Sequence, residues 1–289
     1  MVEQRFCKPL VAGSNPVGGF CHIKIMIEIN FEYWYIFPTA IIIAILCNAS
    51  GFSGSVLFQP IFNFFLGVPI AQSVATGIAT ETVGMTSGAF RYWRIGNKID
   101  VNAVKKVFPY VYSGIAAGIF LFVFLPKTWL RLVVGCSIFS IATYQLYFAY
   151  LGKFGKSERA DLNALRSYKC RIKSFLAGVS SASTGTGIAE IHQPMFEHDA
   201  DLSTKKSNAS AILIEALGNW FITLLNIKLG NINYEILVFS VSGVIIGGQI
   251  GPMISDYISD IILKIIFGVS VSIIGLIYII TSIQNLNII

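Results

Sequence analysis

The sequence predicts an all-α polytopic membrane protein made of two homologous halves, with 8–10 transmembrane helices that include broken ones. Three observations support this fold class: the composition, the long uncharged segments and an internal repeat. Hydrophobic residues make up 54% of the 289 and charged residues 12%, and the mean hydropathy is +0.69. Soluble domains carry about 25% charged residues. The chain therefore has too few charges to cover a surface exposed to water.

Eight long segments are apolar and nearly free of charge, and we expect each to form a membrane helix, because about 20 apolar residues cross a bilayer. In chain order they are residues 33–49, 71–90, 104–125, 128–151, 174–189, 206–227, 235–256 and 260–283. Two shorter apolar stretches, 56–67 and 188–197, each follow a segment rich in glycine and hydroxyl side chains. We expect these two stretches to be half-helices that turn back.

The polar segments divide the chain into four parts. Residues 1–30 contain no continuous apolar stretch and are expected to form a flexible N-terminal tail. Residues 152–173 form the longest polar segment and are rich in Lys and Arg, which keep short loops on the cytoplasmic side. We therefore expect a first transmembrane repeat over 31–151, a basic cytoplasmic linker over 152–173 and a second repeat over 174–289.

A second basic cluster extends from Arg91 to Lys106. Two expected spans, 104–125 and 128–151, separate it from the linker, so parity places both basic regions on the same side of the membrane. The net charge of +6 is thus interpreted as a determinant of topology, and no nucleic-acid partner is predicted.

An internal repeat appears when the chain is offset against itself by 134 residues. Positions 51–100 and 185–234 then align without a gap and share 11 identities over 50 positions, against about three expected from ordinary residue frequencies. The shared residues include Gly51/Gly185, Gln59-Pro60/Gln193-Pro194, Glu81/Glu215 and Gly96-Asn97/Gly230-Asn231. The protein is therefore interpreted as two copies of one unit.

Each copy contains an interrupted segment, "NASGFSGSVLFQP" at 48–60 and "SSASTGTGIAEIHQP" at 180–194. In secondary transporters the substrate site lies where corresponding broken helices meet, and free N–H groups at a helix start suit an oxyanion. The predicted anion site consists of Ser53, Ser55, Gln59, Thr184, Thr186, His192 and Gln193, with Thr76 and Ser210 contributed by the following helices. The alternative is that the glycines only allow close helix packing.

Two further pairs of residues have two interpretations each. Glu81 and Glu215 lie inside apolar segments, where an ionisable group costs roughly 2.5–3.5 kcal/mol. They are interpreted either as a coupling or gating pair, or as structural groups that bond to the broken backbone of a neighbouring helix. Arg91 and Arg94 either attract anions at the cytoplasmic mouth or only determine topology.

The relative orientation of the halves depends on the two half-helices. If they turn back, each half crosses the membrane an odd number of times and the halves are inverted, as in many transporters. If they do not, the halves are parallel. We expect inverted repeats.

Two other classes of function are weighed against anion transport. A divalent metal-cation transporter is suggested by Glu190, His192, Glu197, His198, Asp199 and Asp201. Their repeat partners are mostly apolar, so no metal site is predicted, and "EHDAD" at 197–201 is expected to be a solvated helix end. An intramembrane serine protease is suggested by "GFSG" at 51–54 if Ser53 meets His192. That motif is short, so no enzyme activity, catalytic residue or cofactor is predicted.

The stretch "PIFNFFLGVPIAQSVATGIATETVGMTSGAFRYWRIGNKID" at 60–100 resembles the TauE/SafE sulfite exporter family of anion permeases. Ala75-Thr76 and Arg94-Ile95-Gly96-Asn97 stand at the family's characteristic places, and the resemblance covers roughly residues 40–283. It implies export of sulfite or a small organosulfonate across the inner membrane of the cell, driven by a coupling ion such as a proton or sodium, and often a homodimer. The family's glycine-rich run is reduced here to "GFSGS" and "STGTG", so the substrate does not carry over directly.

Overall fold

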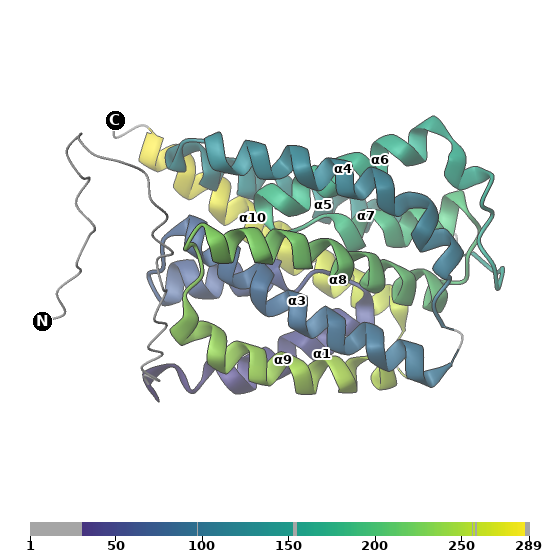
Figure 1. The fold of residues 1–289 in the computed structure, drawn as a ribbon, viewed down its shortest axis with the longest axis horizontal. Coiled ribbons are helices and arrows are strands. Elements are labelled where there is room, and N and C mark those ends of the chain that lie inside the picture. The colour runs from purple at the N-terminus through teal and green to yellow at the C-terminus, as the bar shows by residue number, and fades with distance from the viewer. Residues whose placement is uncertain (1–30, 97, 153–154, 256, 258, 287–289) are drawn as a thin grey trace, which may run out of the picture.

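The fold is a bundle of long helices, as Figure 1 shows for the computed structural model, which describes residues 31–96, 98–152, 155–255, 257 and 259–286. Within these ranges there are ten α-helices and no β-strand. The helices are α1 Ile36–Ser50, α2 Ser55–Pro60, α3 Ile70–Ile95, α4 Val101–Phe124, α5 Lys127–Leu151, α6 Tyr168–Thr184, α7 Ile188–Pro194, α8 Thr204–Lys228, α9 Tyr234–Ile254 and α10 Asp260–Leu286. The predicted all-α class is confirmed. The expected tail at 1–30 lies outside the described residues.

Five of the described helices are long and apolar enough to cross a membrane: α4, α5, α8, α9 and α10. Helix α3 has 26 residues, which gives it a length of about 39 Å at 1.5 Å per residue, but it is less apolar. Its buried residues include Thr76, Thr80, Glu81 and Thr82, which face other helices rather than lipid. The chain is a multi-pass membrane protein.

The two interrupted segments are helical hairpins. Helix α1 ends at Gly51 and α6 ends at Gly185, with left-handed φ angles of 78° and 77°. The short helix after each break continues into one π-helical stretch, η2 Ile61–Phe65 or η4 Met195–Asp199. Pro60 and Pro194 stand where α becomes π, because a proline has no N–H and clashes with the carbonyl four residues earlier. The half-helices expected at 56–67 and 188–197 are thus present.

The loop between α3 and α4 and the linker lie at one end of the bundle, which we call the linker end (Figure 1). The Asp100 carboxylate accepts a hydrogen bond from the Ala160 backbone amide of the linker at 2.9 Å. This contact agrees with the parity argument, which placed both basic clusters on one side. Helix α6 starts at Tyr168, within the residues assigned to the linker. Ser167 caps that start by accepting from the Cys170 amide at 3.3 Å.

Equivalent helices of the two halves run in opposite directions. The Asp100 amide, before α4, donates to Ser210 Oγ near the start of α8 at 2.9 Å. The Asn233 amide, before α9, donates to Thr76 Oγ1 near the start of α3, also at 2.9 Å. The start of α3 therefore lies beside the end of α8, and the start of α8 beside the end of α3 (Figure 1). This antiparallel course supports inverted repeats, whose membrane sidedness stays a prediction.

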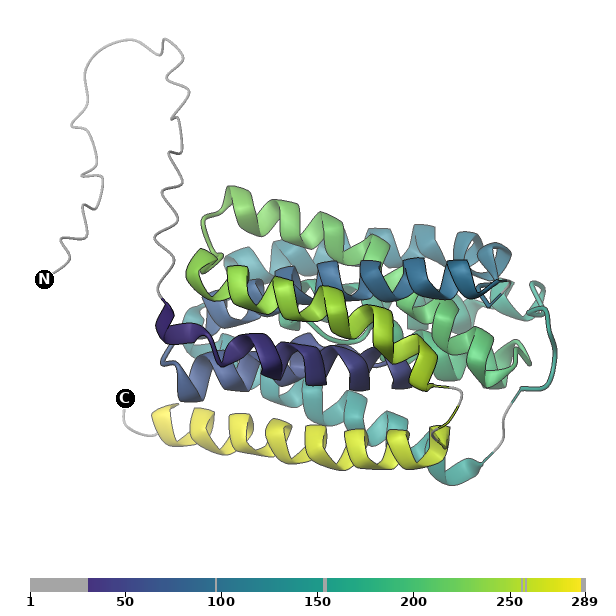
Figure 2. The same cartoon turned by 90° about the horizontal axis from the view of Figure 1, so that it is seen from below.

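The two halves share one core and are not separate domains. Helix α1 packs on α9, α6 packs on α4, and α5 packs on α10, so each close pair joins helices from different halves. Glycines permit the first two contacts: a Cβ at Gly114 or Gly118 of α4 would overlap the backbone of α6, and one at Gly243 or Gly247 of α9 that of α1. In Figure 2 α1 lies between α9 and α10. Phe52, Ser53 and Thr184 at the breaks are fully buried, so the breaks are enclosed by protein.

Candidate functional site

The two breaks, residues 51–54 and 185–187, meet inside the bundle, and we call this meeting point the crossing. Ser53 Oγ donates to the Gly185 carbonyl at 3.1 Å, and Ser55 Oγ donates to the same oxygen. Gln59 Nε2 donates to the Thr184 carbonyl at 2.8 Å. Side chains of the first half thus satisfy carbonyl groups at the C-terminal end of α6, which would otherwise lack partners.

The repeated glycines and glutamines pack against each other reciprocally. Gln59 lies on Gly185, where an added Cβ would be 2.6 Å from Gln59 Nε2. Gln193 lies on Gly51, where an added Cβ would be 3.3 Å from Gln193 Cδ. Each half therefore supplies a glutamine to the glycine that ends the other half's broken helix. This exchange gives a physical reason for the repeat of both residue types.

Three glutamates surround the crossing, and each is at most 2% exposed. Glu81 Oε1 accepts from the Gly54 amide at 2.6 Å, and its other oxygen accepts from Asn219 Nδ2 at 3.3 Å. Glu81 thus bonds to the broken backbone of α2, as its structural interpretation predicted. Glu215 is different, because among the described residues neither of its oxygens has a hydrogen bond of ordinary length and angle, although the Ser53 hydroxyl and the Ala189 amide lie beside them.

Glu190 is a site residue that the sequence suggested only as a candidate metal ligand. Its Oε1 accepts from the Ser53 amide at 2.8 Å and from Thr186 Oγ1 at 3.3 Å, and its Oε2 accepts from the Gly187 amide at 3.0 Å. The available signal was its spacing: a glutamate three residues after the helix start bonds back to the free amides.

His192 lies outside the crossing although it is fully buried. Its Nδ1 faces the Ile188 carbonyl at 2.7 Å, which requires the proton on Nδ1, so Nε2 accepts from Ser174 Oγ of α6 at 3.1 Å. Ser53 instead contacts the Ser55 hydroxyl at 3.0 Å and the Gly185 carbonyl. The serine and histidine that a protease would pair are therefore engaged elsewhere.

The remaining predicted residues separate into two groups. Thr186 and Gln193 belong to the crossing, whereas Thr76 and Ser210 hold the loops at opposite ends of the bundle. Arg91 is half-buried and Arg94 is exposed, with its guanidinium 5.1 Å from the centre of the Phe90 ring. Both arginines lie near the end of α3 at the linker end, a position that fits either of their two interpretations.

The prediction that "EHDAD" at 197–201 is a solvated helix end is wrong for Glu197. That side chain is 2% exposed and forms an ion pair with Lys264 of α10 at 2.8 Å, itself 3% exposed. The start of α10 covers it, a contact that the local sequence does not reveal. Asp199 and Asp201 are exposed as expected. Among the described residues, no three His, Cys, Asp or Glu side chains are placed to hold a metal ion.

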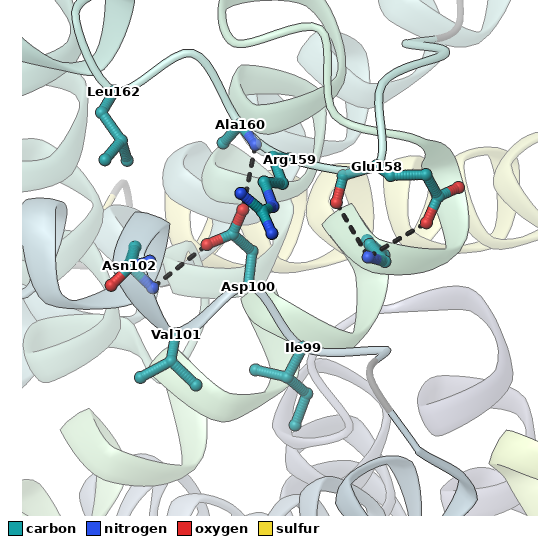
Figure 3. A pocket seen from close by; sticks show the side chains of 9 residues that line it. Ile99, Asp100, Val101, Asn102, Glu158, Arg159, Ala160 and Leu162 are labelled. Atoms are coloured by element: carbon teal, nitrogen blue, oxygen red, sulfur yellow. Dashed lines mark hydrogen bonds and ion pairs between the residues drawn. The ribbon is translucent and has the colours of Figure 1, made fainter.

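A separate cavity of about 520 Å³ opens at the linker end, between the start of α4, the linker and the start of α8 (Figure 3). Asp100 caps α4 there by accepting from the Asn102 and Ala103 amides at 3.1 and 3.0 Å. Lys206 Nζ donates to the Glu158 carbonyl at 2.8 Å and pairs with its carboxylate at 3.0 Å. Acidic and basic groups both line this cavity, so its charge does not favour an anion.

A multi-pass helical protein in which two related halves each insert a broken hairpin to a buried polar crossing has the architecture of a membrane transporter. The family model described as "Sulfite exporter TauE/SafE" matches residues 36–278, which is most of the chain. The chain therefore belongs to the sulfite exporter TauE/SafE family, a family of transporters, as the sequence indicated. No curated protein and no solved structure matches the chain significantly.

Proposed function

We propose that the chain is a secondary transporter that carries a small sulfur oxyanion, such as sulfite or an organosulfonate, across the inner membrane of the cell. Movement is driven by a coupling ion, a proton or sodium. The substrate binds at the crossing, and the two halves expose it alternately to the two sides.

The observation that carries this proposal is the set of donors at the crossing. Backbone amides of Ser53 and Gly54 in the first break, and of Gly187 in the second, all point at carboxylate oxygens. The crossing thus already binds carboxyl oxygen atoms with N–H groups from both halves. Sulfite and sulfonates present the same kind of oxygen, and charged hydrogen bonds of this type contribute about 1.5–3 kcal/mol each.

The reciprocal packing supports alternating access. Hydrogen bonds between individual side chains and backbone groups, such as Gln59 with Thr184, join the halves at the crossing. At each end of the bundle, the loop between two helices of one half is held by a hydroxyl of the other half, Ser210 at one end and Thr76 at the opposite end. Because these loop contacts at opposite ends are nearly equivalent, one end of the protein can open while the other stays closed.

Glu215 is the better candidate of the repeated pair for coupling. Glu215 is fully buried and none of its hydrogen bonds has ordinary length and angle, and an ionised carboxylate is strongly disfavoured in such a place, so binding of a proton or a cation would stabilise it. Glu81 is held by two donors and has a structural role.

The proposal is tested by uptake of radiolabelled sulfite into proteoliposomes with an imposed ion gradient, with taurine, thiosulfate and sulfoacetate as competitors. We expect saturable uptake that falls at least tenfold in Ser55→Ala. Ser242→Ala is the matched control, because the Ser242 hydroxyl is exposed and bonds within α9, to the Val238 carbonyl at 2.8 Å. Uptake of none of these anions, or equal uptake by both variants, contradicts an anion site at the crossing.

A further inference from the structure

Glu190 differs from the other two glutamates of the crossing in having no counterpart in the repeat, where Val56 occupies its place. Its three donors come from both breaks: the Ser53 amide from the first, and the Gly187 amide and the Thr186 hydroxyl from the second. One carboxylate therefore bridges the two halves. It occupies donors that would suit an oxyanion.

The crossing also contains several buried acceptors that are poorly satisfied. Within the described part of the chain, Gln59 Oε1, Gln193 Oε1 and both oxygens of Glu215 have no hydrogen bond of ordinary length and angle. An anion that entered alone would add further acceptors and a negative charge. Two like charges that lie close together in the protein interior repel much more strongly than they do in water. A proton that enters with the anion removes one charge and supplies one donor.

From these observations we propose that the Glu190 carboxylate occupies the hydrogen-bond donors of the substrate site while no anion is bound. When an anion binds, Glu190 takes up a proton and leaves these donors. One proton therefore binds with each anion. The proton comes from water and forms an O–H bond on Glu190. The amides of Ser53 and Gly187 then donate to the oxygens of the substrate, and the net charge of the crossing is unchanged. This inference rests on the proposed anion transport.

Other titratable groups near Glu190 are few. Glu81 of α3, Glu215 of α8 and Cys47 of α1 interact with it electrostatically. Helix α5 presents the Gln145 amide, which donates to the Glu190 carbonyl, and α6 presents Ser180 beside Gly187. In η4, Glu197 is paired with Lys264. His192 on the same helix bonds to Ile188 and Ser174 instead.

The test is calorimetric binding of methanesulfonate, whose charge is constant between pH 5.5 and 8, to the purified full chain in two buffers of different ionisation enthalpy. We expect uptake of one proton per anion. The dissociation constant should rise about tenfold per pH unit wherever Glu190 is ionised. Glu190→Gln should bind without proton uptake and with an affinity that does not depend on pH. The exposed Glu235→Gln at the other end of the bundle should behave like the native protein.

Glu190→Asp retains an acid and should retain the proton uptake, so the test does not depend on the folding of one variant. Binding without proton uptake by the native protein, or unchanged proton uptake in Glu190→Gln, overturns the role of Glu190 and leaves the proposed anion transport intact. If neither methanesulfonate nor sulfite binds at any pH, both proposals fail.

Discussion

At the scale of single residues, the glycine that ends each broken helix performs two tasks. Gly185 adopts a left-handed φ of 77°, and it leaves room for Gln59 Nε2 and for Ser55 Oγ, which an added Cβ would approach to 2.6 and 3.1 Å. A side chain would therefore strain the backbone and separate the two halves at the crossing.

Gly185→Ala should lower the free energy of unfolding by about 1–2 kcal/mol for the left-handed backbone and by a further amount of about 1 kcal/mol for the displaced hydrogen bonds. Gly230→Ala is the matched control, because Gly230 has a φ of 69° and nothing within 4 Å of an added Cβ. Thermal unfolding in detergent measures the difference. Equal losses in the two variants would show that the contact with Gln59 contributes nothing.

The buried pair of Lys264 and Glu197 gives a second prediction at this scale. Lys264→Met removes the cation that pairs with the buried Glu197 carboxylate and should cost about 3–5 kcal/mol of stability. The double variant Lys264→Met/Glu197→Leu should recover most of that loss, because both charges are gone. Thermal unfolding of the three proteins checks this.

The first half offers a matched comparison for the pair of Lys264 and Glu197. Asn63 is the repeat partner of Glu197, and Nη2 of the half-buried Arg131 lies 3.4 Å from the neutral Asn63 Oδ1. Arg131→Met should therefore cost clearly less than Lys264→Met. A larger loss from Arg131→Met would contradict the importance assigned to burial of the charge.

At the scale of elements, the linker is attached to both halves: to the first through the Asp100 carboxylate, and to the second through residues 200 and 201. The Asp161 amide donates to the Ala200 carbonyl at 2.9 Å, and Ser157 Oγ donates to the Asp201 carboxylate at 2.7 Å. Asp201 has a φ of 50°, the only left-handed backbone outside glycine in the described part of the chain. Hydrogen bonds from Ser157 and then from the Lys156 amide hold the pKa of Asp201 below its usual value of 3.8.

Asp201→Asn should loosen the linker and speed tryptic cleavage at the exposed Arg159 several-fold. Because the folded pKa of Asp201 is lowered, its contribution is complete above about pH 4 and is lost as the pH falls through the folded pKa. The linker should thus stay protected at pH 5. Glu235→Gln, far from the linker, serves as control. If Asp201→Asn were cleaved as slowly as the native protein, the hydrogen bonds from the linker to the Asp201 carboxylate would not hold the linker in place.

At the scale of the whole molecule, antiparallel α3 and α8 predict that equivalent loops lie on opposite sides of the membrane. Asn102→Cys and Lys228→Cys place single exposed thiols at the two ends in a background without the native cysteines. A maleimide that cannot cross the membrane should label Asn102→Cys only from the cytoplasmic side and Lys228→Cys only from the other. Labelling of both from one side would contradict inverted repeats.

Much of the fold follows from local properties of the sequence. The eight apolar segments correspond to α1, α3, α4, α5, α6, α8, α9 and α10, because the bilayer sets the length and polarity of a spanning helix. The breaks were predictable because Gly51 and Gly185 allow left-handed backbone and the prolines disrupt regular helix. The identities of the repeat correctly indicated that the breaks are equivalent.

Only the tertiary structure decided which groups meet. Serine, threonine, glutamate and histidine near a break all read alike in sequence, yet Glu190 bridges the halves, His192 turns to α6, and Thr76 and Ser210 hold distant loops. Glu197 is buried because α10, more than sixty residues later in the chain, brings Lys264 onto it. The sequence determined a membrane protein of two broken repeats, since periodicity and polarity act along the chain. The hydrogen-bond partners at the crossing could not be predicted in this way, because they depend on contacts between residues that are far apart in the chain.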